Sequence, residues 1–323
     1  MSARHLLLSA LSALSTSVTA QDWGLSGSWD LVIPSSGTPP TGFAWHHPIA
    51  IAGTAIFAAN NTATGNATAF SFDVATSSWS QFPDNTLAGS SIRQGPFMFA
   101  VGGIAVLLSE SNPNTLYTID SANPNQYGWQ ATQVAVAAPA GRMGMRFFEW
   151  GGVVYFFGGF DTVMHNDFWG LDVSGVLTTI VPASWIMIQG DTTPGMPDAR
   201  IGYTFTAFNV IALMYGGVSP SPTAPIGFNP YQCGEKVNVD AGYCIFHQHV
   251  HGILPGNQPP RENGVPVTRW AQLPLVGANG GPVPAGRFEQ AAGYLGDQLF
   301  VFGGITATGP SSELWAFNLH YQT

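Results

Sequence analysis

Charged residues are scarce in this sequence. Only 8% of its 323 residues are Asp, Glu, Lys or Arg, and the single lysine, Lys236, accompanies eight arginines. The formal net charge is −9. Nucleic-acid binding needs clustered Lys and Arg to neutralise phosphates, and these arginines form no run. We therefore expect no nucleic-acid partner.

Long apolar segments are also lacking beyond the N-terminus. After residue 20 no run approaches the roughly 20 apolar residues that a transmembrane helix needs, so we expect no membrane span. Residues 1–20 combine Arg4, an apolar stretch from Leu6 to Leu14 and a small residue at Ala20. This pattern is typical of a secretory signal peptide. We predict cleavage after Ala20 and a secreted chain, extracellular or at the cell surface.

Cysteine occurs only twice, at Cys233 and Cys244. In a secreted chain, two cysteines at this close spacing favour one local disulfide, and two free buried thiols are the alternative. Asn60 and Asn66 each begin an Asn-x-Thr sequon. Such sequons are acceptors of N-linked glycans in secreted proteins, so we predict glycosylation at both asparagines.

The motifs of common catalytic sites are missing. The chain has no phosphate-cradling glycine loop, no Gly-x-Ser-x-Gly elbow and no His-Glu-x-x-His helix. Isolated acids remain, and a pair of them could meet in space as hydrolytic carboxylates. These acids include Glu149, Asp161, Asp167 and Glu289. The sequence itself does not pair them, and we predict no catalytic residue.

Glycine and proline, by contrast, are abundant, with 39 and 24 residues, as in chains of short strands joined by turns. Three Pro-x-x-Arg segments end at Arg142, Arg200 and Arg287. Sixteen residues after each arginine comes the first glycine of a Gly-Gly pair that ends an apolar run. These pairs are Gly158-Gly159, Gly216-Gly217 and Gly303-Gly304. A recurring spacing of this kind indicates a repeat architecture.

Two weaker copies of the repeat come before these three. The same spacing counted from Arg93, and from Phe43 in place of an arginine, reaches the ends of two further apolar runs. Most copies continue into an aromatic-x-apolar-Asp/Asn step, and a tryptophan begins the last short strand of a copy. These tryptophans are Trp29, Trp79, Trp129, Trp185 and Trp270. The first two intervals between them are 50 residues each.

This order of landmarks resembles the kelch repeat, whose unit of about 50 residues forms one four-stranded blade of a β-propeller. The resemblance implies a single all-β propeller domain at residues 21–323, and the landmarks support about five blades. The 85-residue interval between Trp185 and Trp270 indicates an insertion around residues 218–265, and a degenerate sixth blade is the alternative. The resemblance also implies fold-level similarity to the galactose-oxidase-like superfamily, although no residues here match that family's copper site. We expect a strand at Trp29–Val32 to pair with the last blade and close the ring.

The repeated arginines occupy equivalent positions, which favours a structural role. We expect each guanidinium to donate to backbone carbonyls or to an acid of the adjacent blade, because a buried charge needs partners. An anion-binding site is the alternative for Arg142, Arg200 and Arg287. The fourth copy of the repeat is the atypical one, since it has no clear aromatic-x-apolar-Asp step.

Three histidines alternate in this fourth copy, at His247, His249 and His251. On a strand they would share one face, with neighbours about 6.6 Å apart. Two of them could therefore bind one zinc or copper ion, with a further ligand from a neighbouring strand. The other interpretation is an exposed polar strand face, for which no cofactor is expected.

These features lead us to predict a secreted, non-enzymatic scaffold or binding module. Its low charge and its sequons suit a surface that is glycosylated or covered in an assembly. The expected partner is an extracellular protein or glycan, or further copies of the chain at the cell surface or in a fibre. The alternative is a metal-dependent or carbohydrate-active enzyme, because propellers host both classes of function.

Overall fold

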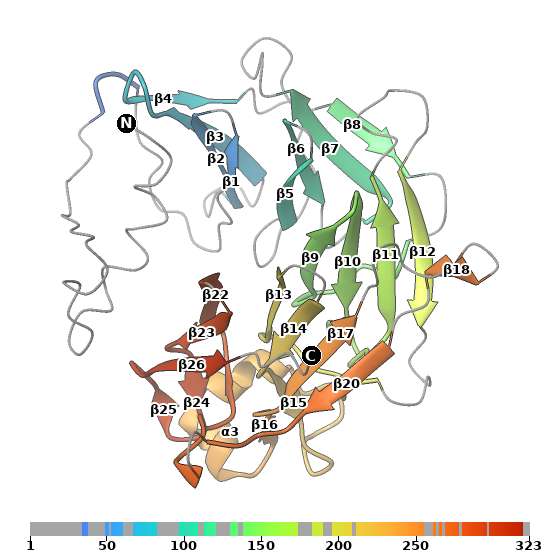
Figure 1. Ribbon diagram of the computed structural model, residues 1–323, viewed down its shortest axis with the longest axis vertical. Coiled ribbons are helices and arrows are strands. Elements are labelled where there is room, and N and C mark those ends of the chain that lie inside the picture. The colour runs from blue at the N-terminus through green and yellow to red at the C-terminus, as the bar shows by residue number, and fades with distance from the viewer. Residues whose placement is uncertain are drawn as a thin grey trace.

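The protein is all-β in the part that the computed structural model describes, and successive antiparallel sheets follow one another along an arc (Figure 1). The described residues are 34–37, 49–51, 53–60, 67–82, 97–101, 103–108, 113–120, 130–134, 138–173, 183–189, 196–208, 211–254, 261–262, 265–266, 269–277, 280–295 and 297–318. Among them, no helix is long and apolar enough to cross a membrane.

The first three sheets each contain four strands in sequence order. The first sheet consists of β1 (Ile49–Ile51), β2 (Thr54–Asn60), β3 (Ala67–Asp73) and β4 (Ser78–Gln81). The second consists of β5 (Phe97–Val101), β6 (Ile104–Leu108), β7 (Thr115–Asp120) and β8 (Gln130–Gln133). The third consists of β9 (Arg146–Trp150), β10 (Val153–Phe157), β11 (Phe168–Asp172) and β12 (Ser184–Gln189).

The fourth and fifth sheets depart from this simple order. The fourth consists of β13 (Thr204–Phe208), β14 (Ile211–Tyr215), β17 (Val250–Leu254) and β20 (Arg269–Leu273). The fifth has three described strands, β22 (Ala291–Leu295), β23 (Gln298–Phe302) and β26 (Leu314–Asn318). Small accessory strands are β18 (Arg261–Glu262), β19 (Val265–Pro266), β21 (Arg287–Phe288), β24 (Ile305–Thr306) and β25 (Gly309–Pro310).

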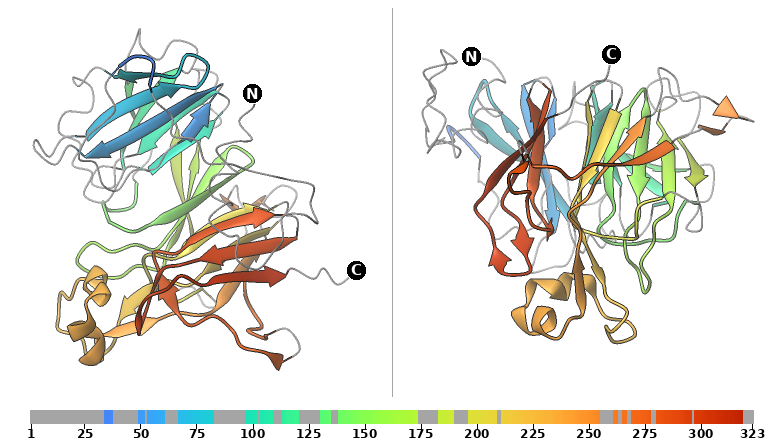
Figure 2. Two further views of the ribbon diagram at one scale, coloured as in Figure 1. Left: turned by 90° about the vertical axis from the view of Figure 1, so that its left-hand side faces the viewer. Right: turned by 60° about the horizontal axis from the view of Figure 1, so that its bottom comes forward.

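The segment between β14 and β17 contains further structure of its own. It consists of β15 (Val218–Pro220), the 3-10 helix η4 (Pro230–Gly234), α3 (Lys236–Asp240) and β16 (Cys244–Phe246). Strands β15 and β16 pair with each other as an antiparallel ribbon. This segment, residues 218–249, is called the insertion below. Both views of Figure 2 show it projecting away from the sheets.

The core lies between neighbouring sheets, and this explains why the second strand of each sheet reads as an unbroken apolar run. In β10, Val154 and Phe156 pack with the second sheet, whereas Tyr155 and Phe157 pack with the fourth. All five β10 side chains are buried. Because successive side chains of a strand point to opposite faces, a strand covered on both faces must be apolar at every position.

The repeat landmarks predicted the strands well. The apolar runs form the second strands, the aromatic-x-apolar-Asp/Asn steps lie in β3, β7, β11 and β26, and Trp79, Trp185 and Trp270 lie in the fourth strands of their sheets. Trp29, Trp129 and Arg93 lie outside the described residues. Multiple four-stranded antiparallel sheets are therefore confirmed. No closed ring is seen among the described strands, and the count of five blades stays a prediction.

The predicted bounds of the insertion, 218–265, were wrong in one respect. Strand β17 (Val250–Leu254) falls within them, but it pairs with β14 and β20 and is the third strand of the fourth sheet. The extra residues therefore lie in two places, in the insertion before β17 and in a second connection that carries the β18–β19 hairpin. Strand β17 was not predicted from the sequence, because His251-Gly252-Ile253-Leu254 stands where the other copies have the aromatic-x-apolar-Asp step.

Candidate functional site

The spacing of sixteen residues in the sequence corresponds to a hydrogen bond. In each complete copy the arginine Nη1 donates to the carbonyl oxygen of the first glycine of the pair. The bonds are Arg142 to Gly158 (3.3 Å), Arg200 to Gly216 (3.1 Å) and Arg287 to Gly303 (2.9 Å). Each Nε also donates to the carbonyl two residues earlier. Each arginine therefore connects the segment before the first strand of its sheet to the glycine that follows the second strand.

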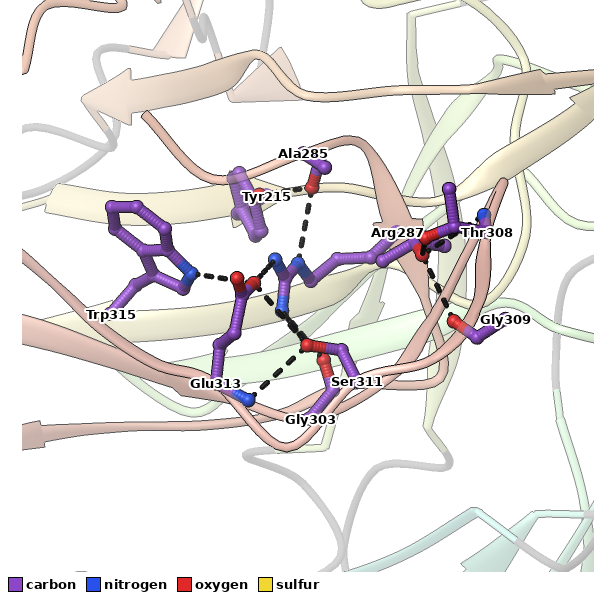
Figure 3. Close-up of polar contacts among 10 residues, drawn as sticks. Tyr215, Ala285, Arg287, Gly303, Thr308, Gly309, Ser311, Glu313 and Trp315 are labelled. Atoms are coloured by element: carbon purple, nitrogen blue, oxygen red, sulfur yellow. Dashed lines mark hydrogen bonds and ion pairs between the residues drawn. The ribbon is translucent and has the colours of Figure 1, made fainter. Parts of the chain in front are cut away.

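Two of these arginines also have a carboxylate partner. Arg142 Nη1 lies 2.7 Å from Asp167 Oδ1, and Asp167 Oδ2 accepts a hydrogen bond from the indole of Trp169. Arg287 Nη2 likewise lies 2.7 Å from Glu313 Oε2, which accepts from the indole of Trp315 (Figure 3). Each acid immediately precedes the third strand of the arginine's own sheet. The expectation of an acid from the adjacent blade was therefore wrong.

The fourth sheet lacks this arrangement. Tyr215 pairs with Val250 where Phe157 pairs with Phe168, so His249 stands at the position of Asp167 and His251 at that of Trp169. Arg200 is 1% exposed and forms no ion pair with any described residue. Burial lowers the pKa of its guanidinium to about 10. The fourth sheet thus buries a cation without the carboxylate that its two neighbours have.

The predicted histidine strand is only partly present. His251 lies in β17, whereas His247 and His249 precede it outside any strand. The rings of His249 and His251 are 6.2 Å apart, and His247 Nε2 lies 2.9 Å from the hydroxyl of Ser219. Among the described residues, no group of three or more His, Cys, Asp or Glu side chains is placed to hold a metal ion.

Both buried imidazoles of this cluster are neutral at physiological pH. Burial first, and the nearby charge of Arg200 second, lower the pKa of His247 and of His251 to about 3. His251 Nε2 is buried and has no hydrogen-bond partner in the described part of the chain. Neutral imidazoles can donate or accept hydrogen bonds but cannot offset the charge of Arg200.

The disulfide is confirmed, and it lies at the base of the insertion. Cys233 and Cys244 are joined, with Cα atoms 5.8 Å apart, and they link η4 to β16. Cys233 is fully buried in a cluster that includes Phe160 of the third repeat, Val218 of the fourth and Phe288 of the fifth. The insertion is therefore held against three consecutive units and is preorganised rather than freely hinged.

Replacing both cysteines with serine should lower the free energy of unfolding by about 2–4 kcal/mol, the usual range for a native disulfide. Because the bond closes a short loop within the insertion, the local effect should be stronger than the global one. Limited proteolysis should cut the variant within residues 218–249 and leave the wild type intact there. Cleavage at the same sites and rate in both proteins would contradict this role.

The insertion exposes aliphatic side chains. Ile226 is fully exposed and Val237 is 68% exposed, and Val163 of the neighbouring connection in the third sheet is 56% exposed. All three side chains lie in connections between the second and third strands of their sheets, each of which begins with a Gly-Gly pair. The exposed surface of these connections is called the insertion face. By contrast, the insertion's Phe228 and Tyr243 contact each other edge to face and are only partly exposed.

Each of the isolated acids has a partner other than another acid. Asp167 is bound by Arg142, Glu149 accepts from the backbone of Gly152, and Asp161 lies 3.3 Å from the Nε2 of His165. The Nη2 of Arg146 donates to both carboxylate oxygens of Glu289, Oε1 at 3.1 Å and Oε2 at 2.9 Å. The four carboxylates therefore have four different partners.

Glu289 also has an unusual backbone conformation, which the sequence did not indicate. Two positions after the repeat arginine the backbone is left-handed in three copies, with glycine in two of them, Gly144 (φ 73°) and Gly202 (φ 64°). Glu289 adopts φ 55° at the third such position, where glycine would be unstrained. The ion pair between Glu289 and Arg146 connects β9, the first strand of the third sheet, to the segment just before β22 in the fifth sheet.

Comparisons with known proteins bear on the fold only. No family model matches the chain, and no curated protein does. Among solved structures, YjhT aligns over 88% of this chain and 84% of its own, with a TM-score of 0.55 and 14% sequence identity. YjhT has a kelch-like, propeller-type fold. This chain has a propeller-like fold. At 14% identity the likeness concerns the fold and extends to no activity or ligand.

Proposed function

We propose that the protein is a secreted, non-catalytic binding module that engages an extracellular protein partner through its insertion face. The observation that carries this proposal is the disulfide-bonded insertion, which is anchored to three units and yet presents Ile226 and Val237 to solvent. A rigid projection loses little conformational entropy on binding, which favours affinity. Large aliphatic side chains exposed together on such a projection are typical of interaction surfaces.

A protein partner is favoured over a glycan by the kind of side chain that is exposed. Sugar rings pack on exposed aromatic faces, but the insertion's Phe228, Tyr231 and Tyr243 are each partly buried. The large hydrophobic residues of the insertion that are most exposed, Ile226 and Val237, are aliphatic. The charges beside Val237 largely compensate one another, since Lys236 pairs with Asp240 at 2.7 Å. Such a surface suits an apolar protein contact rather than a polar sugar.

We further propose a five-bladed, kelch-type ring closed by the N-terminal strand. Four sheets have four strands, whereas the fifth has three, with β26 at its edge among the described strands. Leu295, Phe302 and Leu314 of this sheet are each about two-fifths exposed. A paired fourth strand would satisfy this edge. Residues 29–32, which would supply it, lie outside the described part of the chain.

Removal of residues 21–33 tests the ring closure. The shortened protein should unfold at a lower temperature and expose an open sheet edge that promotes association. Differential scanning calorimetry and size-exclusion chromatography measure both effects. Equal melting temperatures and an unchanged elution volume would argue against closure by this segment.

The secretory route is tested by expressing the full chain in a eukaryotic secretory host. We expect secreted protein that begins at Gln21 and carries glycan mass at Asn60 and Asn66, removable by an N-glycosidase. Peptide mapping by mass spectrometry reports all three features. Retention inside the cell with an intact residue 1–20 segment would contradict the proposed localisation.

Binding through the insertion face is tested by placing a photo-crosslinking amino acid at Ile226. A matched control places it at Val74, an exposed residue between β3 and β4 at the opposite end of the sheets. We expect one extracellular protein to crosslink at Ile226 and not at Val74. The purified partner should then bind the wild type and bind the double variant Ile226→Glu, Val237→Glu at least tenfold more weakly.

Two results would overturn the proposal. One is crosslinking at Val74 equal to that at Ile226, which would mean adventitious contact. The other is reconstituted binding that does not change when Ile226 and Val237 become glutamate, provided the double variant keeps the wild-type melting temperature.

A further inference from the structure

The fourth sheet differs from its two neighbours in one respect that has chemical consequences. Arg142 and Arg287 each bind a carboxylate that directly precedes the third strand, and Arg200 does not. The Nη2 of Arg287 donates to Glu313, whereas the Nη2 of Arg200 has no hydrogen bond to any described residue. Burying a guanidinium without a directly bound anion is costly. Burial lowers the pKa of Arg200, and the charge of Asp198 offsets this only in part, because Arg200 forms no ion pair with any described residue.

The position of the missing carboxylate is buried in the third sheet, where the Asp167 side chain is 8% exposed, and near the surface in the fifth. In the fifth sheet the Glu313 side chain is 57% exposed while Arg287 beneath it is fully buried. His249 stands at the corresponding position, is partly exposed, and makes no hydrogen bond with the described residues. An imidazole with no hydrogen bond at a partly exposed site can rotate aside at little cost. A carboxylate from solvent would then approach Arg200 by the route that Glu313 takes to Arg287.

A second polar group at this place also lacks a partner. His251, 7% exposed, occupies the position of the tryptophans whose indoles donate to the neighbouring carboxylates. Its Nε2 has no partner among the described residues. A neutral imidazole with its proton on Nε2 can donate to a carboxylate oxygen as the indole does. The fourth sheet therefore has two donors, Arg200 and His251, where its neighbours have an arginine and a tryptophan. It lacks only the carboxylate that accepts from them.

We propose that the fourth sheet binds the carboxylate group of a ligand between Arg200 and His251, at the place that Asp167 and Glu313 fill in the neighbouring sheets. The repeat itself favours a carboxylate, because Asp167 and Glu313 at the corresponding positions each accept hydrogen bonds from an arginine and from an indole. This proposal is independent of the protein partner above, since it concerns a single buried cation and not the apolar insertion face.

The test uses acetate as the probe and one substitution that supplies the missing group. Replacing His249 with aspartate installs a carboxylate at the position of Asp167. We expect His249→Asp to raise the melting temperature without acetate and to weaken acetate binding at least tenfold. The wild type should bind acetate saturably, measured by calorimetric titration and by a rising Tm at constant ionic strength. His249→Asn is the matched control and should keep the acetate response without raising the Tm.

Three outcomes would overturn the assignment. One is that acetate affects the wild type and His249→Asp equally, which would place its binding elsewhere. Another is that His249→Asp unfolds at a lower temperature than His249→Asn, because the carboxylate would then find no buried cation. The third is that sulfate at equal ionic strength stabilises the wild type as strongly as acetate, which would indicate general ionic stabilisation.

Discussion

Replacing Arg142 with methionine is expected to lower the free energy of unfolding by about 3–5 kcal/mol, the cost of removing one member of a buried ion pair. The substitution leaves Asp167, whose side chain is 8% exposed, without its cation. It also removes the bond to the carbonyl of Gly158. Chemical denaturation followed by tryptophan fluorescence measures the change.

The exposed pair between Lys236 and Asp240 is the matched control, because its charged atoms lie at the same distance of 2.7 Å. Its side chains are 85% and 59% exposed, so Lys236→Met should change the stability very little. A second comparison replaces Asp167 with leucine together with Arg142→Met. This double variant should be more stable than Arg142→Met alone, since no buried charge remains unpaired. Equal effects of Arg142→Met and Lys236→Met would show that burial does not govern these ion pairs.

Replacing Trp185 with alanine is expected to cost about 3–5 kcal/mol, the range for truncating a large buried aromatic residue. The Trp185 side chain is 2% exposed, and its ring centroid lies 5.1 Å from that of Phe156. Its indole donates to the carbonyl of Pro113 at 2.9 Å, which joins the third sheet to the second. The substitution therefore leaves both a cavity and an unsatisfied carbonyl between two sheets.

Trp185→Phe separates these two contributions. Phenylalanine fills much of the cavity but cannot donate a hydrogen bond to Pro113. We expect it to destabilise the protein by about 1–3 kcal/mol, the cost of an unsatisfied buried acceptor, and so less than alanine does. If the two variants unfold at the same denaturant concentration, packing at this position contributes nothing beyond the hydrogen bond.

The sequence allowed most of the strands to be predicted because each strand is set by local rules. A strand buried on both faces is apolar throughout, and the glycine pairs that end β10, β14 and β23 take positive φ values that other residues avoid. The sixteen-residue spacing was visible because one hydrogen bond, from arginine to glycine carbonyl, recurs in each of three copies. The disulfide was predictable because the chain has only two cysteines.

The candidate site was less predictable. The alternating histidines suggested one strand face, but only His251 is in a strand, because β17 begins at Val250. The expected backbone carbonyls do accept from the arginines, but the acids do not come from the adjacent blade, since Asp167 and Glu313 directly precede the third strand of the same sheet. Neither point can be decided from spacing alone, because strand pairing sets which residues lie beside each arginine and where β17 begins.

The sequence by itself determined the class of fold, the second and third strands of most sheets and the disulfide, since strand periodicity, glycine conformation and cysteine pairing are local properties. Only the tertiary structure decided that His249 and His251 replace the acid and tryptophan of the neighbouring sheets. Strand pairing sets that equivalence, and pairing joins residues that the insertion separates by more than thirty positions. For the same reason, only the structure showed that Arg200 is buried without a carboxylate partner in the described part of the protein.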